Sequence, residues 1–149
     1  MNSSESHTVL LVEDEPHDIL LTRRAFKKAG IHCDLRVVTN GDEAVDYLGG
    51  TGNFADRTKF PLPALVLLDL KLPRRCGLDV LEWVRSRDIL RRMPVVILTS
   101  SRESEDLSRA YDLGANSYLL KPVSFDDLTR MLTTVNLYWL NTIELPPMV

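Results

Sequence analysis

The sequence predicts an α/β fold in which five parallel strands form one doubly wound sheet. Short runs of consecutive apolar residues alternate along the chain with longer segments in which apolar residues recur at helical spacing. Uninterrupted apolar runs are typical of strands buried on both faces, as strands of parallel sheets are. The chain has 149 residues, enough for one domain of about five strand–helix units. The expected strands are 8–12, 35–38, 64–68, 95–98 and 117–120.

The helix boundaries follow from proline, glycine and capping residues. Pro16 suits a first helical position and Gly30 ends the apolar pattern, which predicts a helix over about 16–29. Ser124, followed three residues later by Asp127, resembles a capping box and begins the last helix. The other expected elements are a short helix ended by Gly49-Gly50, a surface loop over 49–63, a helix begun by Gly77 and a polar helix over about 103–112.

The composition excludes several classes of protein. A net charge of -3 gives no indication of a nucleic-acid partner. Residues 1–7 are short and polar, so they are neither a secretory signal nor a membrane anchor, and no run reaches membrane-spanning length. Cys33 and Cys76 lack the spacing of a disulfide framework or a zinc site. We therefore expect a cytoplasmic protein with a disordered tail over 1–7, one domain over 8–140 and a C-terminal tail over 141–149.

Polar residues follow four of the five expected strands. Right-handed crossovers place helices on both faces of a parallel sheet, and five such units match the flavodoxin-like strand order 2-1-3-4-5. In that order Glu13, Asp14, Asp69, Thr99 and Lys121 all lie at the carboxyl edge of the sheet, where ligands of such folds bind. Clustered carboxylates repel one another, so the pattern predicts a bound cation.

Four motifs carry a family resemblance. They are Val12-Glu13-Asp14-Glu15, Leu68-Asp69-Leu70-Lys71-Leu72-Pro73, Val96-Ile97-Leu98-Thr99-Ser100 and Tyr118-Leu119-Leu120-Lys121-Pro122. In this order, and at strand ends, they resemble the receiver domain of two-component response regulators, from Val9 to about Leu140. The long loop before the third strand and the tail from Tyr138 to Pro146 look further like single-domain regulators that partner bacterial phytochrome-type histidine kinases.

The resemblance implies a phosphoacceptor and a metal site. Asp69 would attack the phosphohistidine of a kinase and form an acyl phosphate. Mg²⁺ would be held by Asp14 and Asp69 directly, by Glu13 through water and by the backbone carbonyl of Lys71.

The resemblance also implies a switch. Lys121 would pair with the phosphoryl oxygens and Thr99 would hydrogen-bond one of them. Thr99 would move toward the phosphoryl group, and the ring of Tyr118 would turn into the space it leaves. The Lys121–Pro122 bond would be cis. Lys71 and Ser101 occupy positions that modulate the lifetime of the acyl phosphate in this family.

Taken singly, these residues have ordinary structural explanations. Asp69 suits a turn, Glu15 suits the first turn of a helix, and Tyr118 suits the packing of an edge strand. For the apolar residues of the last helix and tail, we expect a homodimer contact, with folding back onto the same domain as the alternative.

The function expected from the sequence is that of a stand-alone regulator acting through protein contacts or onward phosphorelay. It would be no enzyme beyond phosphoryl transfer to its own aspartate and autodephosphorylation. The alternative is a phosphate-independent adaptor with the same fold. An aspartate-nucleophile phosphatase would need a second aspartate where Lys71 stands, and a flavin carrier would not place Glu13-Asp14-Glu15 beside a phosphate.

Overall fold

The computed structural model describes residues 7–148 and contains the predicted sheet. All neighbouring strands are parallel, and their order is β2-β1-β3-β4-β5. The strands are β1 (His7–Val12), β2 (Cys33–Val38), β3 (Leu65–Leu68), β4 (Val95–Thr99) and β5 (Ser117–Leu120). The predicted flavodoxin-like fold and strand order are therefore confirmed.

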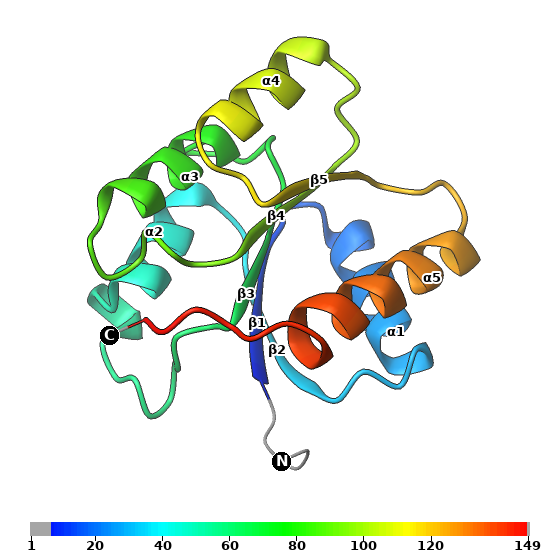
Figure 1. Ribbon diagram of the computed structural model, residues 1–149, viewed down its shortest axis with the longest axis horizontal. Coiled ribbons are helices and arrows are strands. Elements are labelled where there is room, and N and C mark those ends of the chain that lie inside the picture. The colour runs from blue at the N-terminus through cyan, green and yellow to red at the C-terminus, as the bar shows by residue number, and fades with distance from the viewer. Residues whose placement is uncertain (1–6, 149) are drawn as a thin grey trace.

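Helices cover both faces of the sheet (Figure 1). In that view α1 and α5 lie to the right of the sheet, whereas α2 and α3 lie to the left. The helices are α1 (Pro16–Lys28), α2 (Gly41–Gly49), α3 (Gly77–Ser86), α4 (Ser104–Asp112) and α5 (Phe125–Val135), with a 3-10 turn η1 (Gly52–Phe54) and a π turn η2 (Asn136–Leu140) that continues α5. No helix within residues 7–148 is long and apolar enough to cross a membrane.

The core consists of two layers separated by the central strands. Alternate residues of a strand point to opposite faces, so β1 and β3 contribute to both layers. Leu10 and Leu68 pack on the α2 and α3 side, whereas Leu11 and Leu67 pack on the α1 and α5 side. All residues of β3 are buried. This double burial explains why the strand is an uninterrupted apolar run in the sequence.

Side-chain caps begin the helices where the sequence predicts them. Pro16 is the first residue of α1, and the Glu15 carboxylate accepts a hydrogen bond from the His17 backbone N–H at 2.7 Å. Ser124 Oγ accepts from the Asp127 N–H at 3.0 Å. The expected capping role of Glu15 is thus confirmed. Each cap satisfies a backbone donor that the helix itself leaves unpaired.

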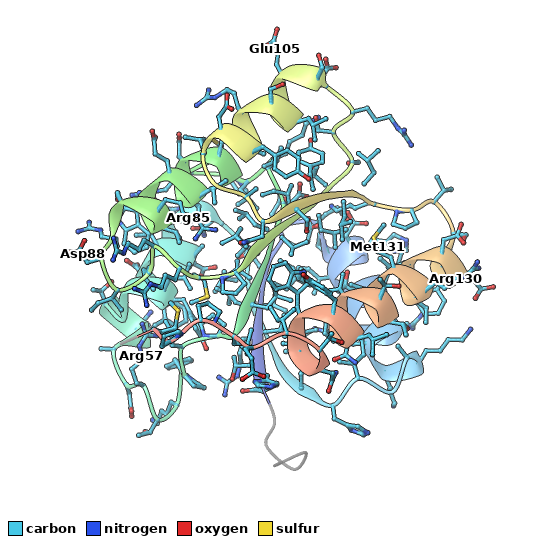
Figure 2. The ribbon with its side chains drawn as sticks, in the orientation of Figure 1. Arg57, Arg85, Asp88, Glu105, Arg130 and Met131 are labelled. Atoms are coloured by element: carbon cyan, nitrogen blue, oxygen red, sulfur yellow. The ribbon has the colours of Figure 1, made fainter. Side chains whose placement is uncertain are left out.

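The segment after α2 is more ordered than its composition indicates. The rings of Tyr47, Phe54 and Phe60 lie 5.1–6.0 Å apart, centroid to centroid. Arg57 donates to the carbonyls of Tyr47 and Leu48, both at 2.7 Å, and Figure 2 shows it beside this loop. The guanidinium thereby adds donors at the end of α2, where the last carbonyls of a helix lack the N–H partners of a full turn.

Two expectations require correction. No cis peptide bond occurs within residues 7–148, so the predicted cis bond between Lys121 and Pro122 is wrong. The trans form is the lower-energy isomer by about 0.5–1 kcal/mol, and with it Lys121 still reaches Asp69. His7, which the sequence placed in a disordered tail, begins β1 through pairing with Cys33. Residues 1–6 of that tail lie outside the described residues.

The C-terminal segment lies against its own domain. Trp139 and Leu140 pack against the layer beneath α1 and α5, and Met148 packs against the opposite layer. Leu145, Pro146 and Met148 line a cavity together with residues at the start of β1 and just before β3 and β4. Within one chain, the tail therefore folds back on its own domain, which was the alternative to the homodimer contact.

Candidate functional site

Strand register brings Glu13 and Asp69 together at the carboxyl edge of the sheet. Val12 pairs with Leu68, so the next residue of each strand emerges at the same level. The Asp69 N–H also donates to the Val12 carbonyl at 3.1 Å. Glu13 is 3% exposed and Asp69 is 6% exposed. Two carboxylates that lie this deep need a positive partner nearby.

Lys121, directly after β5, supplies that positive partner. Its ammonium nitrogen lies 2.6 Å from Glu13 Oε1, 2.7 Å from Asp69 Oδ2 and 2.9 Å from Asp18 Oδ2. An ammonium has three N–H donors, so the three carboxylates match its donor capacity. Burial opposes the charge of Lys121, but the hydrogen bonds to Asp69, Glu13 and Asp18 outweigh it and raise the pKa of Lys121.

At Glu13, unlike at Lys121, burial outweighs the hydrogen bonds. Burial is the largest effect on this carboxyl, and together with the negative charge of Asp69 it raises the pKa of Glu13 to about 7. The hydrogen bond from Lys121 and one from the Glu15 N–H, 3.1 Å from Glu13 Oε2, act in the other direction. Glu13 can therefore gain or lose a proton near neutral pH.

The Asp69 carboxylate is held from both sides. Its Oδ1 accepts from the Leu70 N–H at 2.7 Å and more weakly from the Lys71 N–H at 3.4 Å. Its Oδ2 faces Lys121. The carboxylate is thus fixed in orientation at a buried position.

The backbone of Asp69 is also a packing surface for α3. A Cβ on Gly77 would lie 2.2 Å from the Asp69 carbonyl oxygen and 2.7 Å from the Leu70 Cα. The Gly77 N–H donates to the Leu70 carbonyl at 2.8 Å. Gly77 therefore allows α3 to begin directly against the segment that carries Asp69, a role that its position at a helix start did not reveal.

The other predicted residues contact this cluster only through their backbone or not at all, and none of their side chains forms a hydrogen bond with Glu13, Asp69 or Lys121 within residues 7–148. Asp14 is exposed, and so is the side chain of Lys71. Thr99 is buried at the end of β4, and its carbonyl accepts from the Lys121 N–H at 2.8 Å. Tyr118 is half-buried and packs against the core.

Ser101 connects Thr99, Tyr118 and α4. Its N–H lies 3.3 Å from Thr99 Oγ1, its carbonyl accepts from the Tyr118 hydroxyl at 3.1 Å, and its own hydroxyl donates to Asp106 Oδ2 at 2.5 Å. A movement of Thr99 would therefore act on the same residue that holds the tyrosine and the first turn of α4.

Asp18 is the site residue that the sequence analysis missed. It lies in the first turn of α1, four residues after Asp14. The signal was available, because a helix that begins at the end of β1 places its first turn at the same edge of the sheet. An acidic residue is also favourable at a helix N-terminus, which gave Asp18 an ordinary explanation.

The donor atoms of this cluster suit a hard divalent cation. Within residues 7–148, no three His, Cys, Asp or Glu side chains are arranged to hold a metal ion together, and the Lys121 ammonium lies between Glu13 and Asp69. The carboxyl groups of Glu13, Asp18 and Asp69 nevertheless outnumber the one ammonium group that they contact, so the cluster can still attract a cation. Carboxylate and carbonyl oxygens are the ligands that Mg²⁺ and Mn²⁺ prefer, so the residues present fit such an ion.

Comparison with known proteins identifies the class to which this fold and cluster belong. Residues 9–133 match the family model described as the response regulator receiver domain. The chain belongs to this family of two-component signalling proteins. Within the family it resembles stand-alone regulators of the Rcp1 and RcpA type.

Two relatives align with nearly the whole chain. Response regulator Rcp1 of Synechocystis is 35% identical over 144 residues, which cover 97% of this chain and 96% of Rcp1. The probable methanogenesis regulatory protein FilR2 of Methanothrix harundinacea is 39% identical over 144 residues, which cover 94% of this chain and 88% of FilR2.

Solved structures agree with the fold. The phosphorylated cyanobacterial phytochrome response regulator RcpA is 34% identical with a TM-score of 0.89, covering 96% of this chain and 100% of RcpA. The Mn²⁺-bound form of Rcp1 is 35% identical with a TM-score of 0.84, covering 95% and 99%. The bacteriophytochrome response regulator AtBRR is 45% identical with a TM-score of 0.75, covering 91% and 96%.

Proposed function

We propose that this protein is a stand-alone response regulator that accepts a phosphoryl group from a sensor histidine kinase on Asp69. The observation that carries the proposal is the contact of 2.7 Å between the buried Asp69 carboxylate and the Lys121 ammonium, at the carboxyl edge of the sheet. A carboxylate fixed beside a permanent cation is a nucleophile whose product, an anionic acyl phosphate, has a charge partner already in place.

The proposed transfer is a simple substitution at phosphorus. An Asp69 oxygen forms a bond to the phosphorus of the kinase phosphohistidine, and the phosphorus–nitrogen bond breaks as the imidazole leaves. Lys121 donates to a phosphoryl oxygen and the Thr99 hydroxyl to another. The protein modifies its own side chain, and its only turnover is hydrolysis of that acyl phosphate.

A magnesium ion fits this chemistry. Asp14 and Asp69 would hold it directly, Glu13 through water and Lys71 through its backbone carbonyl, as the sequence analysis predicts. When bound, Mg²⁺ neutralises charge on the phosphoryl group. The Mn²⁺-bound form of Rcp1 supports a divalent ion in a relative of this chain.

The switch would act through residues that already share hydrogen bonds. As Thr99 turns to a phosphoryl oxygen, its contact with the Ser101 N–H is lost. The Tyr118 hydroxyl and Asp106 are bonded to the same serine, so the start of α4 and the tyrosine ring respond together. A local change of charge thereby alters the surface of α4 and β5.

The proposed partners are a histidine kinase and a second copy of the chain. RcpA is a phytochrome response regulator and AtBRR a bacteriophytochrome response regulator, which supports a kinase of the phytochrome type as the partner. We propose that the two proteins meet in the cytoplasm. Leu137 and Tyr138 are more than half exposed on the turn after α5, which supports a homodimer contact there.

Intact mass spectrometry tests the proposal. We expect the protein, incubated with acetyl phosphate and Mg²⁺, to gain one phosphoryl group, and Asp69→Asn to gain none. Asp79→Asn, which removes an exposed carboxylate from α3, is the matched control and should behave as the wild type. No gain in the wild-type protein, together with no binding of beryllofluoride, would favour the phosphate-independent adaptor.

A further inference from the structure

We propose that Asp18 is a positioning residue that holds the Lys121 ammonium on the α1 side of the phosphoacceptor. This role rests on the proposed function and adds to it a residue outside the four motifs. The Asp18 Oδ2 atom lies 2.9 Å from the Lys121 nitrogen, across a sequence separation of 103 residues. The pair joins the first turn of α1 to the end of β5.

Asp18 differs from the two other carboxylates that bind Lys121. The Asp18 side chain is 34% exposed, whereas those of Glu13 and Asp69 are buried. Among the described residues, Lys121 is the single side chain with which the Asp18 carboxylate forms a hydrogen bond. Asp69 and Glu13 have further tasks in the proposed chemistry, because one bonds to phosphorus and the other would hold the cation through water. Asp18 has none.

Because Asp18 has no other task, it can hold Lys121 while the phosphoryl group is transferred to Asp69. Once an Asp69 oxygen is bonded to phosphorus, it is a weaker acceptor, and Lys121 must turn a donor to a phosphoryl oxygen. A flexible four-carbon side chain needs an anchor to stay in place during that exchange. Asp18 is the carboxylate whose bond to Lys121 persists through the exchange, so it keeps the ammonium within reach of the incoming group.

The test separates positioning from charge. Asp18→Ala removes the anchor, Asp18→Asn keeps an acceptor without charge, and Asp18→Glu restores a carboxylate on a longer side chain. Asp126→Ala is the matched control, because Asp126 forms an exposed ion pair with Lys28 of α1 and none with Lys121. Phosphorylation by phosphoramidate would be followed by intact mass at saturating Mg²⁺, and Mg²⁺ affinity by calorimetry.

We expect Asp18→Ala to lower the maximal phosphorylation rate about tenfold at saturating Mg²⁺, with Asp18→Glu restoring part of the rate and Asp126→Ala unchanged. Should Asp18→Ala fail to fold, Asp18→Asn is expected to show a smaller loss of maximal rate. A full maximal rate in the Asp18 variants, with only weaker Mg²⁺ binding, would overturn the positioning role and leave the proposed function intact. An unphosphorylated wild-type protein would overturn both.

Discussion

At the scale of single residues, the charges clustered around Lys121 are better explained by a function than by a contribution to stability. Removing two carboxylates and an ammonium from water costs several kcal/mol per ion, and their mutual attraction often does no more than offset this cost. The raised pKa values of Glu13 and Lys121 have different causes, because burial dominates at Glu13 whereas three ion pairs overcome burial at Lys121. The site therefore holds charge that a purely structural core would replace with apolar groups.

The pKa of Glu13 predicts a pH-dependent cost in stability. The folded protein binds a proton at Glu13 more tightly than the unfolded chain does, since the pKa rises from 4.5 to about 7. The stabilisation that comes from this tighter proton binding is fully present below pH 4.5 and is lost as the pH rises through about 7. Without divalent cations, the wild type should lose about 1–3 kcal/mol relative to Glu13→Gln between about pH 5 and pH 8.

Urea denaturation of both proteins in the presence of a chelator measures this difference. Titrating groups outside the cluster are common to the two proteins, so the double difference reports Glu13 together with the cluster groups that it contacts. A constant difference across this pH range would show that Glu13 is not perturbed by burial.

At the scale of elements, the strands that surround the site were the most predictable parts of the chain. β3 and β4 are buried on both faces, and so they are continuous apolar runs. β2 begins at Cys33, two residues earlier than expected, because an edge strand is held by backbone pairing with β1 that leaves little trace in composition. The order of the loop after α2 was missed, since it depends on ring contacts and on one arginine.

The candidate site was also predictable only in part, because some of its contacts depend on how side chains and helices pack. Residues placed directly after strands could be assigned to one edge of the sheet, because the topology carries them there. Asp18 lies on a helix, and its contact with Lys121 depends on how α1 packs. The Lys121–Pro122 isomer was inferred from family resemblance, and no feature of the residues themselves required the cis form.

The start of α3 gives a prediction at this scale. A Cβ at position 77 would overlap the backbone of Asp69 and Leu70, so Gly77→Ala should destabilise the protein by about 3 kcal/mol and slow phosphorylation. Gly30→Ala is the control: its Cβ would meet nothing within 4 Å, and the cost comes from a φ of +69°. That variant should lose about 1–2 kcal/mol and keep the wild-type phosphorylation rate.

Denaturation and intact-mass kinetics on the two variants provide the measurement. Equal rates for Gly77→Ala and the wild type would mean that α3 does not fix the position of Asp69.

At the scale of the whole molecule, the two edges of the sheet have different tasks. The carboxyl edge gathers the charged cluster from β1, β3 and β5, whereas the C-terminal tail lies against the opposite edge. The tail already packs against its own domain, so it is not free to contact a second copy of the chain. The proposed homodimer would therefore use the exposed residues of η2, Leu137 and Tyr138.

We expect Leu137→Glu to weaken self-association, because it places a charge in the proposed contact. Ile89→Glu is a matched control, since Ile89 is 65% exposed and Leu137 is 62% exposed. Sedimentation velocity with and without acetyl phosphate measures the effect. A wild-type protein that is monomeric in both conditions would contradict the dimer without affecting the phosphoacceptor.

The most direct test of the central claim is to locate the phosphoryl group chemically. Borohydride reduces an acyl phosphate on aspartate to homoserine, and peptide mass spectrometry then identifies the modified position. After treatment with phosphoramidate and Mg²⁺, we predict homoserine at position 69 and aspartate at positions 14 and 18. Reduction at another carboxylate, or at none in a protein shown to be folded, would contradict the assignment of Asp69 as the phosphoacceptor.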